Sequence, residues 1–496
     1  MIAWALILPL AAGASLLLLE RFGLSIQRVA SAVACAAGLL LAIELLAQAN
    51  TGAVQISLIG NWPSDVGIVL AMDRFSALLL VLTAILGVVA SVYAARGADR
   101  EAPHFHALLQ FQLLGLYGAF LTGDLFNLFV WFEVLLIASY GLLLHGANKE
   151  RLRAGLKYVV FNLLASALFL IGLGLLFGVV GTLNMADVAV KVAAMPPEQQ
   201  ALANAAALLL LIVFAIKAAL LPLYFWLPGT YGAAPAAAAL LFAIMTKVGV
   251  YAIVRVFTLV FPDSAWIWVL PLGLLTLFAA AIGALVAPTF ARICAQWTIA
   301  SAGTLMIGFA LGTEAATAAA INYLVQSTLL GALLFLLVDA FRRARVGGDA
   351  LAGGGAMAHA RFVAPLAFVA MIAAAALPPS PGFLAKALLL GAAIDAPRTV
   401  IVWLVVLASG FLMLLALAHA FSQLLWHRAE GNPRRDFSPI DLAMPLVLVA
   451  AIAALAINAD PLQRFAQSTA AQLHDRDALI AATRAAEVKP RPEIAP

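Results

Sequence analysis

The sequence predicts an all-α polytopic membrane protein of about 14 transmembrane helices, with two inverted five-helix repeats that each contain a broken helix. Of its 496 residues, 65% are apolar and only 10% are charged, which is too few polar residues to cover a soluble domain of this size. About fourteen apolar runs reach the roughly 18 residues that cross about 30 Å of hydrocarbon. Two of these runs contain clustered prolines, which interrupt helices.

The apolar runs define the expected spans and leave basic residues between them. The spans are 2–20, 29–48, 73–94, 107–122, 124–145, 156–181, 203–221, 235–258, 266–286, 293–312, 316–340, 363–391, 399–426 and 439–457. The basic loops, which this count puts on one side, are Arg21/Arg28, Arg96/Arg100, Lys149/Arg151/Arg153/Lys157, Arg342/Arg343/Arg345/Arg361 and Arg428/Arg434/Arg435. Because basic loops favour the cytoplasm, we expect both termini to be periplasmic.

The two broken spans suggest how the chain is divided. The first break lies in Phe214–Pro228 around Pro222, and the second lies in Ala373–Lys386 around Pro379. Breaks in corresponding positions of two halves indicate inverted repeats with a transport site at each broken helix. The expected segments are 1–106 (helices 1 to 3), 107–258 (first repeat, helices 4 to 8), 259–426 (second repeat, helices 9 to 13), 427–457 (helix 14) and 458–496 (a short surface helix and a frayed tail).

Several classes of site are not supported by the sequence. Cys35 and Cys294 lie in apolar runs without partners at metal-ligand spacing, which favours buried hydrophobic side chains over a disulfide or a metal site. The net charge of +4 arises from basic residues in short loops between spans, where they orient the chain in the membrane. We therefore expect no nucleic-acid partner. We find no Gly-rich nucleotide loop, haem ligand set or Cys cluster in the sequence, and we expect no cofactor.

Four charged residues lie deep inside or beside broken spans: Glu133, Lys217, Lys247 and Lys386. A charge at the bilayer centre costs about 2.5–3.5 kcal/mol on insertion scales, so such residues are rare and usually functional. Because moving one charge changes the proton occupancy of its neighbour, a Glu133–Lys217 pair that opens and closes would act as a proton switch. The alternative is a static salt bridge, but three lysines against one deep carboxylate leave charge uncompensated. We therefore interpret the four residues as a proton relay.

Other polar residues are weaker candidates for the same path. His419 either passes protons onward or is a hydrogen-bonded core histidine. Asp124 opens the fifth span and is most simply a helix N-cap. Asp339 lies close to Arg342 and Arg343 at a helix end, which favours an interfacial ion pair over a relay. Proton entry is a further interpretation for three histidines near the cytoplasmic rim: His104, His106 and His145.

The runs TGDLFNLFVWFEVLLIASYGLL and FAIKAALLPLYFWLPGTYGAAPAAAALLFAIMTKVGVYAIVR resemble the antiporter-like subunits shared by complex I and the Mrp antiporters. Within that family the sequence is most similar to the D-type subunits of the multisubunit Na+(K+)/H+ antiporters known as Mrp, Mnh, Sha or Pha, over nearly the whole chain. The resemblance implies a fourteen-helix fold with two inverted repeats. It also implies that the family's relay residues of helices 5, 7, 8 and 12 correspond to Glu133, Lys217, Lys247 and Lys386.

One helix departs from the family pattern. Where many relatives have paired histidines and a lysine in the eleventh helix, this chain reads NYLVQSTLLGALLFLL, with Gln326, Ser327 and Gly331. The sequence therefore lacks the usual lysine or histidine of the eleventh helix, which forms the central part of the relay in the second repeat of many relatives. We hypothesise that water held by Gln326, Ser327 and Thr328 bridges the gap.

These observations predict a proton-translocating component of a multisubunit monovalent cation/proton antiporter, which is not an enzyme in its own right. The expected partners are antiporter subunits of the A, B, C, E, F and G types, membrane lipid, protons, and Na+ or K+. The expected location is the bacterial inner membrane. Two alternatives stay open: a proton-pumping component of NADH:quinone oxidoreductase or a membrane-bound hydrogenase, and a non-transporting scaffold whose buried charges lock helices together.

Overall fold

The computed structural model of the chain describes all residues except 65–66, 147, 263–264, 354, 356, 397, 427–437 and 487–496. The described residues form nineteen α-helices, one two-stranded sheet and short 3-10 turns. Twelve of these helices are long and apolar enough to cross a membrane. The chain is therefore a multi-pass membrane protein, as expected. The expected loop residues Arg428, Arg434 and Arg435 lie outside the described residues.

The first half of the chain contains helices up to α10 and a small hairpin. The helices are α1 (Trp4–Leu19), α2 (Leu24–Ala49), α3 (Arg74–Ala94), α4 (Phe105–Leu121), α5 (Leu125–Leu144), α6 (Lys149–Val180), α7 (Met185–Ala193), α8 (Pro197–Ala218), α9 (Leu227–Ala233) and α10 (Ala236–Leu259). Strands β1 (Gln55–Leu58) and β2 (Val69–Met72) pair antiparallel, with Gln55 opposite Met72. The hairpin and α7 fall in two loops between expected spans.

The second half of the chain continues the bundle and ends in two further helices. Its helices are α11 (Trp266–Leu285), α12 (Phe290–Ala310), α13 (Glu314–Ala344), α14 (Ala360–Ala374), α15 (Pro381–Ala392), α16 (Thr399–Leu425), α17 (Pro439–Ile457), α18 (Ala459–His474) and α19 (Arg476–Arg484). The expected fourth span is α4, and the expected twelfth span is α14 followed by α15. Each of these three helices is shorter than a full crossing. Counting α4 as one span and α14 with α15 as another, in addition to the twelve long helices, gives the expected number of about fourteen.

Several expected boundaries were wrong. Besides Lys149 and the basic residues that follow it, four described residues expected in loops lie inside α-helices: Arg28 in α2, Arg342 and Arg343 in α13, and Arg361 in α14. Lys149 was expected in a loop with the basic residues that follow it, but α6 begins at Lys149 and the Asn148 side chain caps it by accepting from the Arg151 N–H. Apolar residues mark the hydrocarbon, whereas the capping residue decides where the helix begins. The segment after residue 457 was expected to form one short surface helix, but within the described residues it forms α18 and α19.

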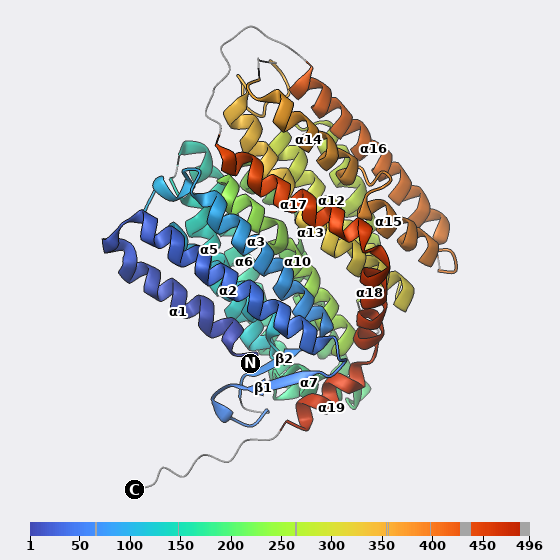
Figure 1. Ribbon diagram of the computed structural model, residues 1–496. Coiled ribbons are helices and arrows are strands. Elements are labelled where there is room, and N and C mark those ends of the chain that lie inside the picture. The colour runs from blue at the N-terminus through green and yellow to red at the C-terminus, as the bar shows by residue number, and fades with distance from the viewer. Residues whose placement is uncertain are drawn as a thin grey trace.

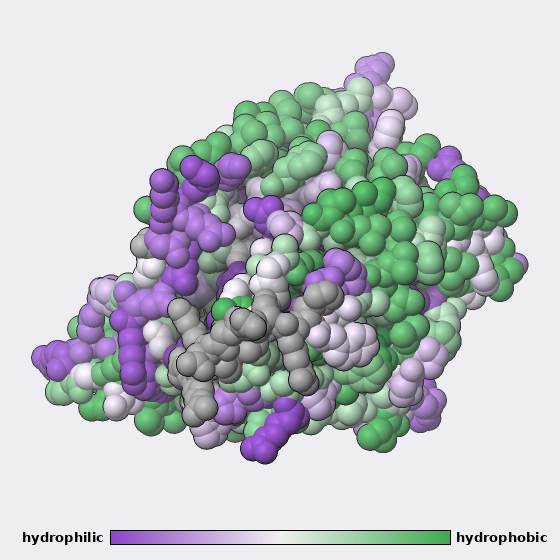
Figure 2. All heavy atoms as spheres, turned by 90° about the horizontal axis from the view of Figure 1, so that it is seen from above, coloured by the Kyte–Doolittle hydropathy of each residue, from purple (hydrophilic) through white to green (hydrophobic). Residues whose placement is uncertain are grey.

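The connecting segments sort to two ends of the bundle. β1, β2, α7, α19 and the N-terminus lie together at one end, here called the hairpin end (Figure 1). The opposite end, here called the basic end, carries ion pairs between a helix and a connecting segment: Arg28 of α2 with Asp99, and Asp441 of α17 with Arg96. Figure 2 looks onto the basic end and shows hydrophilic residues gathered beside large hydrophobic areas. The expectation that the basic loops share one side of the membrane stays a prediction.

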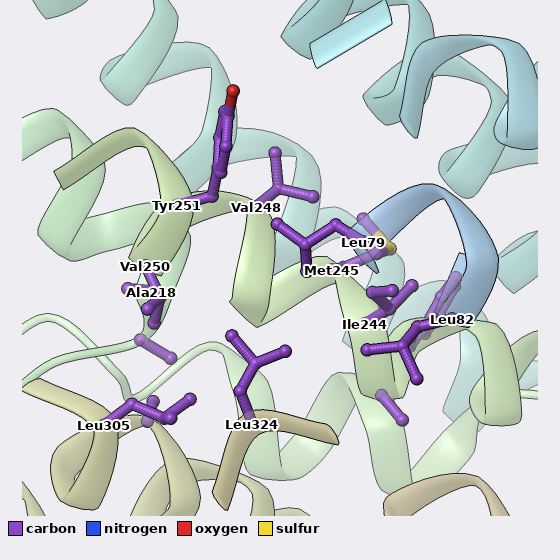
Figure 3. Packing of buried hydrophobic residues seen from close by; sticks show 14 of the residues in the cluster. Leu79, Leu82, Ala218, Ile244, Met245, Val248, Val250, Tyr251, Leu305 and Leu324 are labelled. Atoms are coloured by element: carbon purple, nitrogen blue, oxygen red, sulfur yellow. The ribbon is translucent and has the colours of Figure 1, made fainter. Parts of the chain in front are cut away.

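Helix α10 lies at the centre of the molecule, and its apolar stretch is fully buried. It packs against α3, α8, α12 and α13, so it joins the two halves of the chain. Figure 3 shows side chains from these helices around it: Leu79 and Leu82 of α3, Ala218 of α8, Leu305 of α12 and Leu324 of α13. Because α10 also carries Lys247 and Arg255, enclosure by neighbouring helices keeps these charged side chains away from lipid.

Both helix breaks have the same backbone geometry. Ala219 after α8 and Ala376 after α14 adopt left-handed φ angles of 56° and 54°. In each case the next amide donates to the carbonyl five residues back, at 2.9 Å after Ala219 and 3.0 Å after Ala376. The shared geometry is what two helices in corresponding positions of a repeat would show. The extent of the five-helix repeats stays a prediction.

Tryptophan side chains donate hydrogen bonds to backbone carbonyls beside both breaks. The Trp226 indole donates to Ile216 O at 3.2 Å near the first break, and the Trp297 indole donates to Ala374 O at 3.0 Å near the second. Backbone groups at membrane depth need such partners because lipid offers none. The breaks are thus stable parts of the fold, set by partners on neighbouring segments.

Replacing Gly249 by Ala should destabilise the junction between α8 and α10. A Cβ atom at Gly249 would lie 2.3 Å from the Ala218 nitrogen, which is backbone and has to shift. Overpacking of this kind costs about 1–3 kcal/mol, so the midpoint of thermal unfolding of the purified protein should fall by several degrees. Gly174→Ala on α6 is the matched control, since nothing lies within 4 Å of a Cβ there. Equal midpoints for the two variants would contradict the proposed close packing.

Candidate functional site

Glu133 is positioned by the start of α5. The Asp124 carboxylate caps this helix by accepting from the Asn127 N–H at 2.7 Å, so the expected capping role of Asp124 is what the structure shows. Glu133 follows about two and a half turns later. Its side chain is partly buried, and Oε1 accepts a hydrogen bond from the Ser166 hydroxyl of α6.

Lys217 is linked to Glu133 through α6 and is not in direct contact with it. The Lys217 ammonium donates to Asn162 Oδ1 at 3.0 Å, and the Ser166 hydroxyl lies 2.9 Å from the Asn162 carbonyl. Asn162 Nδ2 donates to Tyr158 O at 2.8 Å, which turns the amide oxygen toward the lysine. Because Asn162 and Ser166 are four residues apart, they share one face of α6. Glu133, Ser166, Asn162 and Lys217 form a chain of contacts, here called the bridge, in which the single Ser166 hydroxyl hydrogen goes either to Glu133 Oε1 or to the Asn162 backbone carbonyl.

The surroundings of Lys217 favour a positive charge without a carboxylate beside it. Lys217 lies in the last turn of α8, where free carbonyls and the helix dipole carry partial negative charge. Its ammonium also lies 5.6 Å from the centre of the Phe132 ring, within the range of a cation–π interaction. The helix break and the bridge therefore offset part of the cost of burying this lysine.

Lys247 connects the first expected repeat to the second. It lies on α10 with no exposed surface, and its ammonium donates to the Ser301 hydroxyl of α12 at 2.8 Å. Ser301 in turn donates to Thr298 O at 2.7 Å. Among the described residues, no carboxylate forms an ion pair with Lys247. A second hydroxyl, that of Thr246, lies 3.5 Å from the ammonium. A buried lysine whose acceptors are neutral hydroxyls is suited to change its charge.

The second break brings Gln326 and Lys386 into one region. Gln326 on α13 is 1% exposed and lies against Gly382 of α15, and its Nε2 approaches Ala373 O at 3.5 Å. Within the described part of the chain its Oε1 has no hydrogen-bond partner. Lys386, four residues after Gly382, is partly buried, and we find no hydrogen bond or ion pair from it to a described residue. Ser327 donates only to its own helix.

The remaining candidates lie apart from this region. His419 is exposed on α16, and no hydrogen bond joins it to a described relay residue. Asp339 accepts from Arg343 Nε and from the Tyr93 hydroxyl, both at 2.7 Å, which is the ion pair expected at that helix end. Neither residue extends the bridge.

The rim histidines form a separate polar cluster at the basic end. His106 Nε2 lies 3.4 Å from Asp99, which also pairs with Arg28, and His104 pairs with Glu20 at 3.0 Å. Burial opposes ionisation of Asp99, but hydrogen bonds from Arg28 and His106 outweigh it and hold the pKa of this carboxyl below its ordinary value. A cavity of about 430 Å³ lies beside the cluster. His145 is buried nearby at the end of α5.

Sequence reasoning missed a buried ion pair between α3 and α10. Arg255 donates to Asp73 at 2.6 Å and to the Ser76 hydroxyl at 3.2 Å, and Tyr251 lies 3.1 Å from that hydroxyl. Tyr251 and Arg255 follow Lys247 at intervals of four residues, so the three lie on one side of α10. The position of Arg255 inside an apolar run was a signal that could have indicated this pair. In the same way, the spacing of Asn162 and Ser166 by four residues could have indicated a polar face on α6.

Comparison with known proteins gives consistent matches. Residues 122–412 match the family model described as NADH:quinone oxidoreductase/Mrp antiporter, TM. A Rhizobium meliloti (strain 1021) protein, named as the D component of a probable K(+)/H(+) antiporter, is 38% identical over 467 residues, covering 86% of each chain. The D component of the Na(+)/H(+) antiporter of Alkalihalophilus pseudofirmus is 38% identical over 479 residues, covering 95% of this chain and 96% of that protein.

The solved structures give the same result for the fold. A chain in the structure of the Mrp complex from Dietzia sp. DQ12-45-1b superposes with a TM-score of 0.90 at 26% sequence identity. The match covers 97% of this chain and 99% of that one. Because the agreement extends over nearly the whole length, the architecture described above is a shared one.

Replacing Arg255 by Leu should strongly destabilise the protein, because it leaves the Asp73 carboxylate buried without its partner. Breaking a buried pair on one side costs about 3–5 kcal/mol. The double variant Asp73→Asn with Arg255→Leu should recover much of the loss, since asparagine can still cap α3 and carries no charge. Thermal unfolding of the purified protein measures both.

An exposed ion pair serves as the control for this comparison. Arg464→Leu removes a pair with Asp460 whose side chains are 70% and 75% exposed, and it should leave the unfolding midpoint nearly unchanged. If the single and double variants at Asp73 and Arg255 lost stability equally, the ion pair would not be the reason for the loss.

Proposed function

Because the chain belongs to the NADH:quinone oxidoreductase/Mrp antiporter family of membrane proteins, we propose that it is the proton-translocating D-type subunit of a multisubunit antiporter. The complex would exchange Na+ or K+ for protons. The names of the two relatives, one given for K+ and one for Na+, support antiport and leave the cation open. In this proposal the chain is part of a secondary transporter and not an enzyme.

The single observation that carries the proposal is the bridge. A static salt bridge would bring Glu133 and Lys217 into direct contact, since a buried charge left unpaired is costly. Two neutral side chains, Ser166 and Asn162, lie between them instead. Either charged group can therefore change its protonation state while the other keeps a hydrogen-bond partner.

Protons move in this proposal by successive changes of charge. An ionised Glu133 favours the charged form of Lys217, and protonation of Glu133 removes that preference, so Lys217 releases its proton toward α10. Gly249 brings the end of α8 against α10, two residues from Lys247. The hydrogen bond from Lys247 to Ser301 leads into the second half of the chain. Water bridges the gaps between these groups.

The second half of the path ends at the second break in this proposal. Lys386 is the last charged group, and Gln326 lies beside the same break in place of a charged residue on α13. Asp339, Ser327 and His419 have no part in it, because their contacts are to a neighbouring arginine, to their own helix or to no described relay residue.

Placement in the cell follows from the same proposal. The protein would lie in the bacterial inner membrane with the basic end in the cytoplasm and the hairpin end in the periplasm, so both termini would be periplasmic. Its partners would be the A, B, C, E, F and G type subunits. A role in a redox-driven pump is the second candidate, since the family model covers both kinds of complex. Neighbouring genes for redox proteins would favour that candidate.

Glu133→Gln should abolish transport without disturbing assembly. The amide keeps the hydrogen bond to Ser166 but cannot hold or release a proton, and loss of such a group costs at least about 100-fold in many sites. The measurement is the cation-dependent pH change in inverted vesicles containing the whole complex. Glu150→Gln, at an exposed position of α6, is the control and should transport normally. Full transport by Glu133→Gln would favour a scaffold.

Ser301→Ala should slow transport several-fold, because it removes the hydroxyl that accepts from Lys247. Ser409→Ala is a matched control: its hydroxyl is also buried in a helix of the second half and has no partner among the described residues. Both variants lose one oxygen atom, so a difference in vesicle transport reports the contact with Lys247. Equal rates for the two would remove Ser301 from the path.

A further inference from the structure

We propose that α18 forms the outer wall of a proton exit path in the second half of the chain, and that Gln463, Asn322 and Gln326 line this path as a column of amides. The inference rests on the proposed function and extends it to a helix that the sequence suggested was only a surface element. The ligand of the column is water that carries protons between the second break and the hairpin end.

Helix α18 makes polar contacts with the core in addition to its buried apolar face. It continues directly from α17 and runs along the side of the bundle toward the hairpin end (Figure 1). The Asn322 amide of α13 donates to Gln463 Oε1, and Thr317 of α13 lies 3.0 Å from His474 Nε2. The apolar stripe that normally holds a surface helix is present on α18 as Ala466, Ala470 and Leu473, which are buried in the core. The amide contact from Asn322 to Gln463 is additional to this attachment.

The column continues from this contact into the core. Asn322 and Gln326 are four residues apart on α13, so their side chains lie on one face about 6 Å apart along the axis. Exposure falls from 7% at Asn322 to 1% at Gln326. Gln326 lies against Gly382 at the start of α15, one turn before Lys386. The three amides thus connect a partly exposed position on α18 with the second break.

The innermost amide needs a partner that the described side chains do not supply. Gln326 Oε1 is buried and unpartnered among the described residues, and a buried acceptor without a hydrogen bond costs about 1–3 kcal/mol. Water is the usual partner for such a group. A chain of water from Gln326 past Asn322 would also provide the hydrogen bonds along which a proton moves.

Charge argues for protons over Na+ or K+ in this column. The N-terminus of α15, capped by Ser380, points its positive end at the second break, and Lys386 follows within the same helix. A metal cation held by the Gln326 oxygen would lie next to this positive charge. Water next to a lysine can accept a proton and pass it on, so a neutral amide column suits proton release.

The test compares two pairs of substitutions in the whole complex in inverted vesicles. Asn322→Leu with Gln463→Leu keeps side chains of similar volume between α13 and α18 but removes the column's polarity, and it should lower transport at least fivefold. Asn322→Ser with Gln463→Ser keeps polar groups and leaves room for water, and it should keep at least half of the rate. Gln467→Leu, at an exposed position of α18, is the control and should transport normally.

The outcomes separate the inference from a bracing role and from the proposed function. Normal transport by the leucine pair, or equal losses by the leucine and serine pairs, would overturn the column. If the leucine pair fails to assemble, the serine pair must still transport, and Asn322→Cys in a Cys35→Ala, Cys294→Ala background must react with a membrane-impermeant thiol reagent. No reaction would overturn the inference. Glu133→Gln in the same vesicles tests the proposed function independently, because it lies on the other half of the path.

Discussion

The cost of holding charge among helices surrounded by hydrocarbon governs how this protein is built. Lys217 meets that cost at the end of α8, where the free carbonyls of the last turn, the Phe132 ring and Asn162 Oδ1 compensate its charge together. A continuous helix would have no carbonyl end at this depth. The break after Lys217 therefore supplies part of the electrostatic environment that the lysine needs, and the Trp226 indole donates to the Ile216 carbonyl beside it.

Close packing around α10 turns these local environments into one connected structure. Gly249 has no side chain, so the Lys217–Ala218 backbone rests directly on α10, two residues from Lys247. Lys247 then reaches Ser301 of α12, and the Arg255–Asp73 pair holds the same helix to α3. Because well-packed interiors do not deform continuously, we expect a change of charge at one of these residues to shift the positions of its neighbours on α10.

The two halves of the chain have different polar side chains at their helix breaks. The first half joins a carboxylate and an ammonium through hydrogen-bonded side chains, whereas the second half has Lys386 and a neutral amide, Gln326, at its break. The proposed column explains how a neutral position on α13 is compatible with proton transfer, since water held by amides can substitute for a titrating residue. It also gives α18 a role that depends on its contact with Asn322.

The sequence by itself determined the membrane class, the approximate spans, both helix breaks and the four charged residues, because hydrocarbon tolerates neither unpaired backbone nor charge without a strong reason. It left undecided that Ser166 and Asn162 separate Glu133 from Lys217, that Ser301 receives Lys247, that Asp73 pairs with Arg255, and that α18 returns to α13. These are contacts between segments far apart in the chain. Only the tertiary structure decided them, since hydropathy states which residues are buried but not which helix each one faces.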